Sequence, residues 1–99
     1  MLTSTSTQIA VYHLVWQDFA GFLRRMRQRR GLSQERLAEQ LGCHRTYIWR
    51  LEHCHNRPSN VFLHNLKMTF ELSSQEATLL AGFEYLRSYH RDEVEIEEG

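Results

Sequence analysis

The chain has 99 residues, about two-fifths of them apolar, which is enough for one core of modest size. No stretch approaches the roughly eighteen apolar residues of a membrane span, and the N-terminus lacks the basic region of a signal peptide. Two cysteines are too few for a disulfide scaffold, so we expect an intracellular, cytoplasmic protein with reduced thiols.

Zero net charge hides an asymmetry between the two parts of the chain. Residues 1–60 hold nine arginines against four acidic residues, whereas residues 61–99 hold three basic residues against eight acidic ones. Arginine outnumbers lysine eleven to one, and arginine is the better bidentate ligand for phosphate and guanine. A solvated basic face balanced by an acidic tail is the alternative interpretation.

The N-terminal segment combines two patterns. Residues 1–7 are rich in serine and threonine, and we expect them to be disordered. Residues 8–17 contain β-branched residues typical of a strand, but their apolar residues recur at steps of three and four, which favours a helix. We expect this helix to break near Asp18, which can cap a new start. The chain therefore divides into an N-terminal tail and apolar extension (1–17), a folded domain (18–90) and an acidic tail (91–99).

Three helices are predicted between residues 18 and 52. The first covers residues 18–30, carries arginines on its outer side and stops at Gly31. The second covers residues 33–41, where Ser33 can accept backbone hydrogen bonds as the N-cap and Gly42 suits the left-handed position after the last turn. The third runs from about His44 to Glu52. Its spacing turns Ile48 and Leu51 inward and leaves the outer side to Arg45, Thr46, Trp49 and Arg50.

Two further helices are predicted after Pro58, which cannot continue a helix. Ser59 caps a helix over residues 60–71, and its apolar spacing buries Val61, Leu63, Leu66 and Phe70. Ser73 or Ser74 caps the last helix, which Gly82 can interrupt before a final aromatic turn or two. We therefore expect an all-α fold: a compact bundle of about five helices with an extra N-terminal apolar segment.

Two short helices that cross over a tight turn, the second exposing arginine and threonine, form a helix-turn-helix pattern. Residues 22–42, FLRRMRQRRGLSQERLAEQLG, together with Ile48, Leu51-Glu52 and Arg57-Pro58-Ser59, resemble the Cro/Xre-type (lambda-repressor-like) helix-turn-helix family. The resemblance covers roughly residues 19–81. It implies a bundle of four or five helices that binds double-stranded DNA, usually as a dimer on a two-fold-related operator.

The resemblance also implies roles for individual residues. Those that correspond to the base-reading positions are Arg45, Thr46 and Arg50. Those expected to contact the DNA backbone or to flank the readout are Arg24, Arg27, Gln34, His44, Tyr47, Trp49 and Arg57. Two positions depart from the family pattern: His44 replaces a small or polar cap, and Cys54 replaces a glycine near the end of the recognition helix.

A metal site or an active site is not expected. Zinc could be bound by thiolates and imidazoles such as those of Cys43, His44, His53, Cys54 and His55. Their spacing fits no common zinc-finger pattern, and Cys43 occupies an apolar turn position, so we predict no metal and no cofactor. The sequence contains no nucleophile–histidine–acid phrase, no glycine-rich phosphate loop and no paired carboxylates on a folded element, which argues against an enzyme.

Two functions are compatible with these patterns. The first is a sequence-specific transcriptional regulator, such as a repressor, that acts as a homodimer. Its dimer contact would come from Trp16 and its neighbours or from Phe83, Tyr85, Leu86 and Tyr89, although a role in the monomer core explains these residues equally well. The second is an antitoxin-like or adaptor module whose acidic residues 91–98 bind a protein partner.

Overall fold

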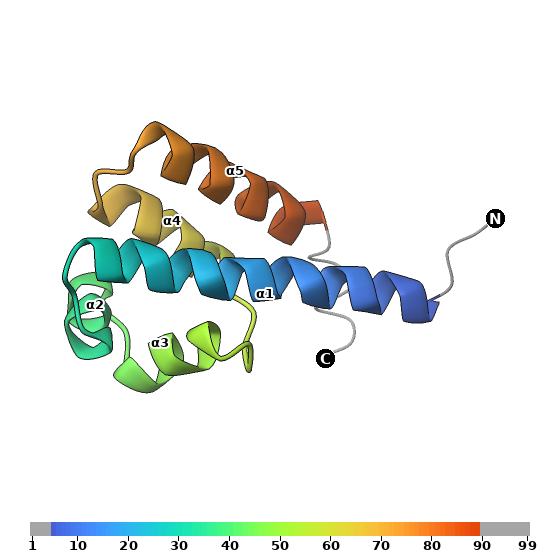
Figure 1. The fold of residues 1–99 in the computed structure, drawn as a ribbon, viewed down its shortest axis with the longest axis horizontal. Helices are drawn as coiled ribbons and strands as arrows, with labels where there is room; N and C mark the ends of the chain where they lie inside the picture. Colours follow the sequence, from blue (N-terminus) through green and yellow to red (C-terminus); the bar gives the residue numbers. More distant parts are fainter. Residues whose placement is uncertain (1–4, 90–99) are drawn as a thin grey trace. The chain divides into compact units, whose positions relative to one another are not determined.

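The structure is a computed structural model that describes the backbone of residues 5–89 and the side chains of residues 14–88. Within that range there are only helices, which confirms the predicted all-α class (Figure 1). They are α1 (Thr5–Arg29), α2 (Gln34–Leu41), α3 (Arg45–Glu52), α4 (Asn60–Thr69) and α5 (Ser74–Tyr89). The chain forms two units, the first ending at Arg57 and the second beginning at Pro58. The acidic tail, residues 91–99, lies outside the described residues.

The N-terminal segment and the first arginine-rich helix form one continuous helix, α1. The helix predicted over residues 8–17 is confirmed, but the predicted break near Asp18 is wrong, and residues 5–7 are helical rather than disordered. The reason is that the apolar stripe continues through Asp18 and Gly21, burying Trp16, Phe19, Leu23 and Met26. The boundary expected between residues 17 and 18 therefore falls inside a helix.

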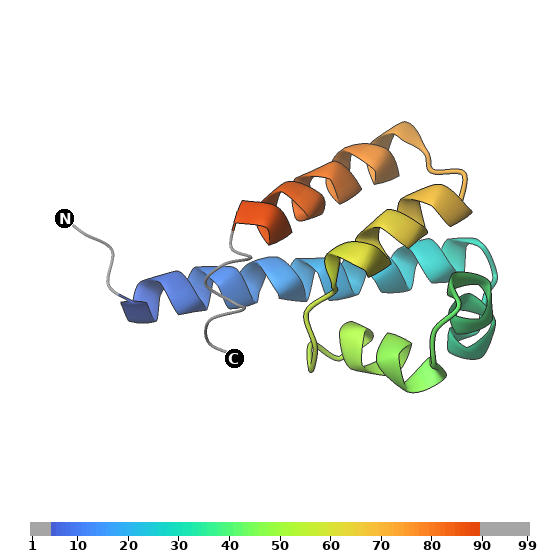
Figure 2. The ribbon, with the colours of Figure 1, turned by 180° about the vertical axis from the view of Figure 1, so that it is seen from behind.

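The helix pair forms as its end signals predict. Ser33 Oγ accepts a hydrogen bond from the backbone N–H of Arg36 at 3.0 Å, and Gly42 adopts a left-handed φ of 71° after α2. His44 Nδ1 accepts from the N–H of Thr46 at 3.1 Å and so caps α3. Both ribbon views show α2 at the carboxyl end of α1 and α3 alongside α1 (Figures 1 and 2).

The second unit consists of α4 and α5 packed against each other (Figure 2). The prediction that α4 buries Val61 is wrong: its side chain is 68% exposed, while Phe62, Leu63 and Leu66 are buried. The helix also ends at Thr69, before the half-buried Phe70. The prediction placed Val61 on the inner face of α4, whereas the structure places Phe62 there beside Leu63 and Leu66. The inner face of the helix is therefore rotated by one residue position relative to the prediction.

The last helix runs through Gly82 without the predicted interruption. Its start is fixed by a capping box, in which Ser73 N–H donates to Glu76 Oε1 at 3.0 Å and Glu76 N–H donates to Ser73 Oγ at 3.1 Å. Leu80 and Phe83 are buried, whereas Leu79 is exposed. The helix is therefore long enough to carry its aromatic residues in one unbroken element.

Candidate nucleic-acid interface

Helix α3 has two chemically different faces. Ile48, Leu51 and Glu52 are buried, and they share one side of the helix because they are spaced by three and four residues. Thr46 and Arg50, which are four residues apart, lie on the opposite, exposed side. Arg45 and Trp49 are also exposed, so the four residues that the sequence assigns to the outer side of this helix are all accessible.

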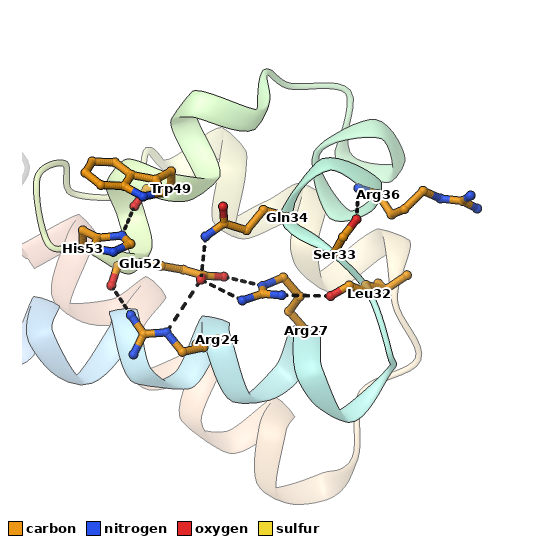
Figure 3. A network of polar contacts seen from close by, with 9 residues as sticks. All are labelled: Arg24, Arg27, Leu32, Ser33, Gln34, Arg36, Trp49, Glu52 and His53. Atoms are coloured by element: carbon orange, nitrogen blue, oxygen red, sulfur yellow. Dashed lines mark hydrogen bonds and ion pairs between the residues drawn. The ribbon is translucent and has the colours of Figure 1, made fainter.

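The inner face of α3 is held by a network of polar contacts around Glu52 (Figure 3). Arg27 from α1 makes two parallel contacts with the carboxylate, Nε to Oε2 at 2.7 Å and Nη2 to Oε1 at 3.0 Å. Gln34, the first residue of α2, donates from Nε2 to Oε1 at 3.1 Å. Arg24 donates from Nη2 to the Glu52 carbonyl at 2.6 Å, and its Nε lies 3.7 Å from Oε1. One buried carboxylate thus links α3 to both α1 and α2.

The network determines the orientation of the exposed face. An ionised carboxylate only accepts hydrogen bonds, and the fork of Arg27 fixes its plane. Arg27 Nη1 also donates to the carbonyl of Leu32 at 2.9 Å, which ties the loop between α1 and α2 to the same cluster. Because donors reach Glu52 from two helices, α3 cannot rotate about its axis without breaking several of these bonds. Its outer side chains are consequently presented in one direction.

Sequence reasoning assigned Arg24, Arg27 and Gln34 to the DNA backbone and did not predict their contacts with Glu52. The signal was present, because a glutamate on the inward face of a helix requires a buried partner. The Arg24 side chain is 43% exposed and keeps a surface that a phosphate can reach, whereas the Arg27 side chain is only 14% exposed. The DNA contacts of these residues stay predictions; the structure shows their role within the protein.

Three aromatic rings gather at the end of α3. The imidazole of His53 stacks on the indole of Trp49, with 4.0 Å between the ring centroids and 19° between the planes. The ring of His55 also stacks on this indole, at 5.3 Å and 28°. His53 Nδ1 lies 2.9 Å from the carbonyl oxygen of Trp49 (Figure 3). His53 is exposed and continues the outer face of α3, although it was not among the residues predicted to contact DNA.

The remaining predicted contact residues are at the start of α3, on its flank and after it in the chain. His44 is exposed at the start of α3 and serves as its N-cap. Tyr47, on the flank of α3, is half-buried, as is Arg57 at the end of the first unit. All of the residues assigned to base readout or to backbone contact therefore belong to the first unit, which ends at Arg57.

The cysteine and histidine residues do not form a metal-binding cluster in the part of the chain that the structure describes. Burial raises the pKa of the Cys43 thiol above its ordinary value, so this thiol stays protonated at neutral pH. Cys54 has a left-handed φ of 61°, which confirms that it takes a helix-end conformation usually left to glycine. Cys43 is therefore part of the turn between α2 and α3, and Cys54 is part of the turn after α3.

The five residues predicted for a dimer contact are not equally accessible. Trp16 and Phe83 are buried within the chain and expose little surface. Leu86 is half-buried, and the Tyr89 side chain lies outside the described ones. Tyr85 is 68% exposed. Trp16 and Phe83 thus contribute to the core of the chain, and a dimer contact through the other residues stays a prediction.

Comparison with known proteins gives one match. The sequence model of the helix-turn-helix domain matches residues 18–79, which include α2, α3, α4 and the arginine-rich part of α1. No curated protein and no solved structure matches the chain. Within residues 5–89, no helix has both the length and the apolar character needed to cross a membrane.

Proposed function

Because the chain belongs to the helix-turn-helix domain family, we propose that it is a sequence-specific transcriptional regulator that binds double-stranded DNA as a homodimer. The observation that carries the proposal is the division of α3 into two faces. One face is fastened to α1 and α2 through Glu52, and the other exposes Thr46 and Arg50. A helix of this size fits the major groove of B-form DNA.

Base readout is assigned to Arg45, Thr46 and Arg50. An arginine can donate two hydrogen bonds to O6 and N7 of guanine, and a threonine can bond a base edge or contact the methyl group of thymine. Arg24, which contacts α3, and Arg57, which follows it in the chain, carry positive charge and are assigned to the phosphate backbone, which positions the protein without reading sequence. Gln34 is also assigned to the phosphate backbone, and within the protein it holds α3 in place by donating to Glu52.

A homodimer is the second part of the proposal. A single helix-turn-helix module reads one half-site, and a second copy brings affinity and specificity into the usual range for operators. Apolar side chains exposed on the second unit support association, since Val61 and Met68 lie seven residues apart on one face of α4 and Tyr85 is exposed on α5. Tyrosine and methionine are both enriched at protein interfaces.

Selection of bound duplexes from a random DNA pool tests the whole proposal. A homodimer should enrich two inverted half-sites whose centres are separated by about 10 base pairs or a multiple of this spacing. A single enriched half-site would contradict the dimer, while the absence of any enriched sequence would contradict sequence-specific binding. The last result would favour the alternative, an antitoxin-like or adaptor module that binds a protein partner through its acidic tail.

A further inference from the structure

His53 lies on the predicted DNA-facing surface, at the end of α3. It directly follows α3 and is the C-cap of that helix, with a φ of −106° and a ψ of 14°. It lies three residues after Arg50 and seven after Thr46, which puts all three on one face of the helix. All three side chains are exposed. A duplex that contacts Thr46 and Arg50 would therefore meet His53 at the next turn.

The imidazole of His53 is held in one orientation. Its ring stacks on the indole of Trp49 at 4.0 Å, and its Nδ1 lies 2.9 Å from the Trp49 carbonyl oxygen, which also accepts the backbone N–H of His53 at 3.0 Å. A carbonyl oxygen can only accept, so Nδ1 must carry a hydrogen and donate it. The other ring nitrogen, Nε2, has no hydrogen-bond partner among the residues that the structure describes.

This arrangement determines what Nε2 can bind. In the neutral ring Nε2 only accepts, and in the protonated ring it only donates. Phosphate oxygens of DNA accept hydrogen bonds, so a phosphate contact requires the protonated ring, whereas an amino group of cytosine or adenine would require the neutral ring. The state of the ring therefore distinguishes backbone contact from base readout.

The surroundings of His53 favour the phosphate. A positive ring at this position would lie at the C-terminal end of α3 and against the face of an indole, and both interact favourably with a cation. The charged or titratable groups nearby are Arg50 on the same face, Arg24 from α1, the Glu52 carboxylate and His55. Arg50 and Arg24 are themselves positive and oppose a charge on the ring, and the Glu52 carboxylate is already engaged by Arg27, so the negative charge that offsets a positive His53 would come from a DNA phosphate.

We propose that protonated His53 donates a hydrogen bond from Nε2 to a phosphate of the DNA backbone, which couples DNA binding to the uptake of one proton. The inference rests on the proposed DNA-binding function and adds a contact residue and a pH dependence to it. Because the contact exists only in the protonated state, affinity is higher at low pH and falls as the ring loses its proton. One linked proton changes the affinity by at most about tenfold per pH unit.

The test compares the full chain with His53→Asn on a selected duplex, at about pH 6 and about pH 8, the range in which histidines titrate. Asparagine keeps a donor for the Trp49 carbonyl but has no equivalent of Nε2. We expect this variant to bind roughly threefold to tenfold more weakly at pH 6 and equally at pH 8. At pH 6 its slope of log affinity against log salt should be shallower by about 0.9, the value for one phosphate contact.

Two further variants complete the test. His53→Lys, which is charged throughout this range, should retain tight binding at pH 8. His64→Ala, at an exposed histidine on α4, should leave the pH dependence unchanged. The inference alone is overturned if His53→Asn binds like the unaltered chain at both pH values, or if the unaltered chain binds more tightly at pH 8 through His53. A chain that binds no duplex at any pH overturns the proposed function as well.

Discussion

At the scale of single residues, the buried Glu52 has the greatest consequence for how α3 is presented. Its side chain is 1% exposed, so its charge has left water and must be offset by the donors around it. Such a pair adds little stability compared with an apolar pair of the same shape, because the cost of desolvation roughly cancels the attraction. Its effect is geometric: the bonds exist only in the orientation that turns Thr46 and Arg50 outward.

Removing the carboxylate should destabilise the protein strongly. Glu52→Ala leaves the Arg27 guanidinium, only 14% exposed, without its partner, and we expect the free energy of unfolding to fall by about 3–5 kcal/mol. Urea denaturation followed by circular dichroism measures this change. The control is Glu39→Ala, which removes an exposed contact with Arg36 and should cost less than about 0.5 kcal/mol. Similar losses in both variants would contradict the role assigned to the network.

The base-reading role of Arg45 can be tested separately from folding. Arg45 is exposed at the start of α3, so Arg45→Ala should leave stability nearly unchanged. We expect affinity for the selected duplex to fall by about 1–3 kcal/mol if the side chain makes a bidentate base contact. Binding isotherms with selected and scrambled duplexes measure it. An equal loss on both duplexes would indicate a phosphate contact instead, and no loss on either would exclude any contact.

At the scale of the elements, the ends of the helices determine the turn between α2 and α3. Gly42 has a left-handed backbone and its N–H donates to the carbonyls of Ala38 and Glu39, which ends α2. His44 then starts α3 two residues later by accepting from Thr46. Cys54, after the other end of α3, adopts a left-handed conformation without being a glycine. These short-range contacts set the length of α3 and the direction of the chain on both sides of it.

Two glycine substitutions should have opposite effects on stability. A methyl group at Gly42 meets no atom within 4 Å, so Gly42→Ala should cost about 1–2 kcal/mol from the left-handed backbone alone. Gly82 also has open space around it but lies inside α5, where Gly82→Ala should add about 0.5–1 kcal/mol. Thermal unfolding of both variants checks the signs. Destabilisation by the second substitution would show that a Cβ is not tolerated at this point of α5.

At the scale of the whole molecule, charge and exposed apolar surface are distributed along the chain in different ways. The residues assigned to DNA lie in the first unit. Residues 1–60, which include this unit, contain nine arginines and only four acidic residues. Among the described residues, the large apolar side chains that are exposed are Val61, Met68, Leu79 and Tyr85 in the second unit and Leu14 and Trp49 in the first. Four of these six therefore lie in the unit to which no DNA contact is assigned.

The proposed association should depend on Tyr85. Static light scattering of the unaltered chain over a range of concentrations should show the mass rising toward twice that of the monomer. Tyr85→Glu places a charge on the exposed apolar surface and should shift the equilibrium toward the monomer by tenfold or more, about 1.4 kcal/mol. Gln75→Glu adds the same charge near the start of α5 and should have little effect. A monomeric unaltered chain at tens of micromolar would contradict the homodimer.

Much of the fold follows from signals that act within a few residues. Ser33, Gly42 and His44 have the roles predicted for them, because caps and left-handed turns depend on groups two to five residues away. The apolar spacing of α3 likewise identified Ile48 and Leu51 as buried. The wrong prediction of a break near Asp18 also came from a local signal, because aspartate can cap the start of a helix. The continuous apolar face of α1 outweighed that signal.

The sequence by itself therefore determined the helix class, the helix-turn-helix pair and the exposed face of α3, because each depends on periodicity and on the chemistry of helix ends. Only the tertiary structure decided which partners Glu52 binds, since Arg24, Arg27 and Gln34 lie 18 to 28 residues away from it along the chain. The same holds for the burial of Trp16 and the exposure of Val61. Periodicity shows that a residue shares a face with others, but only packing between helices decides whether that face is covered.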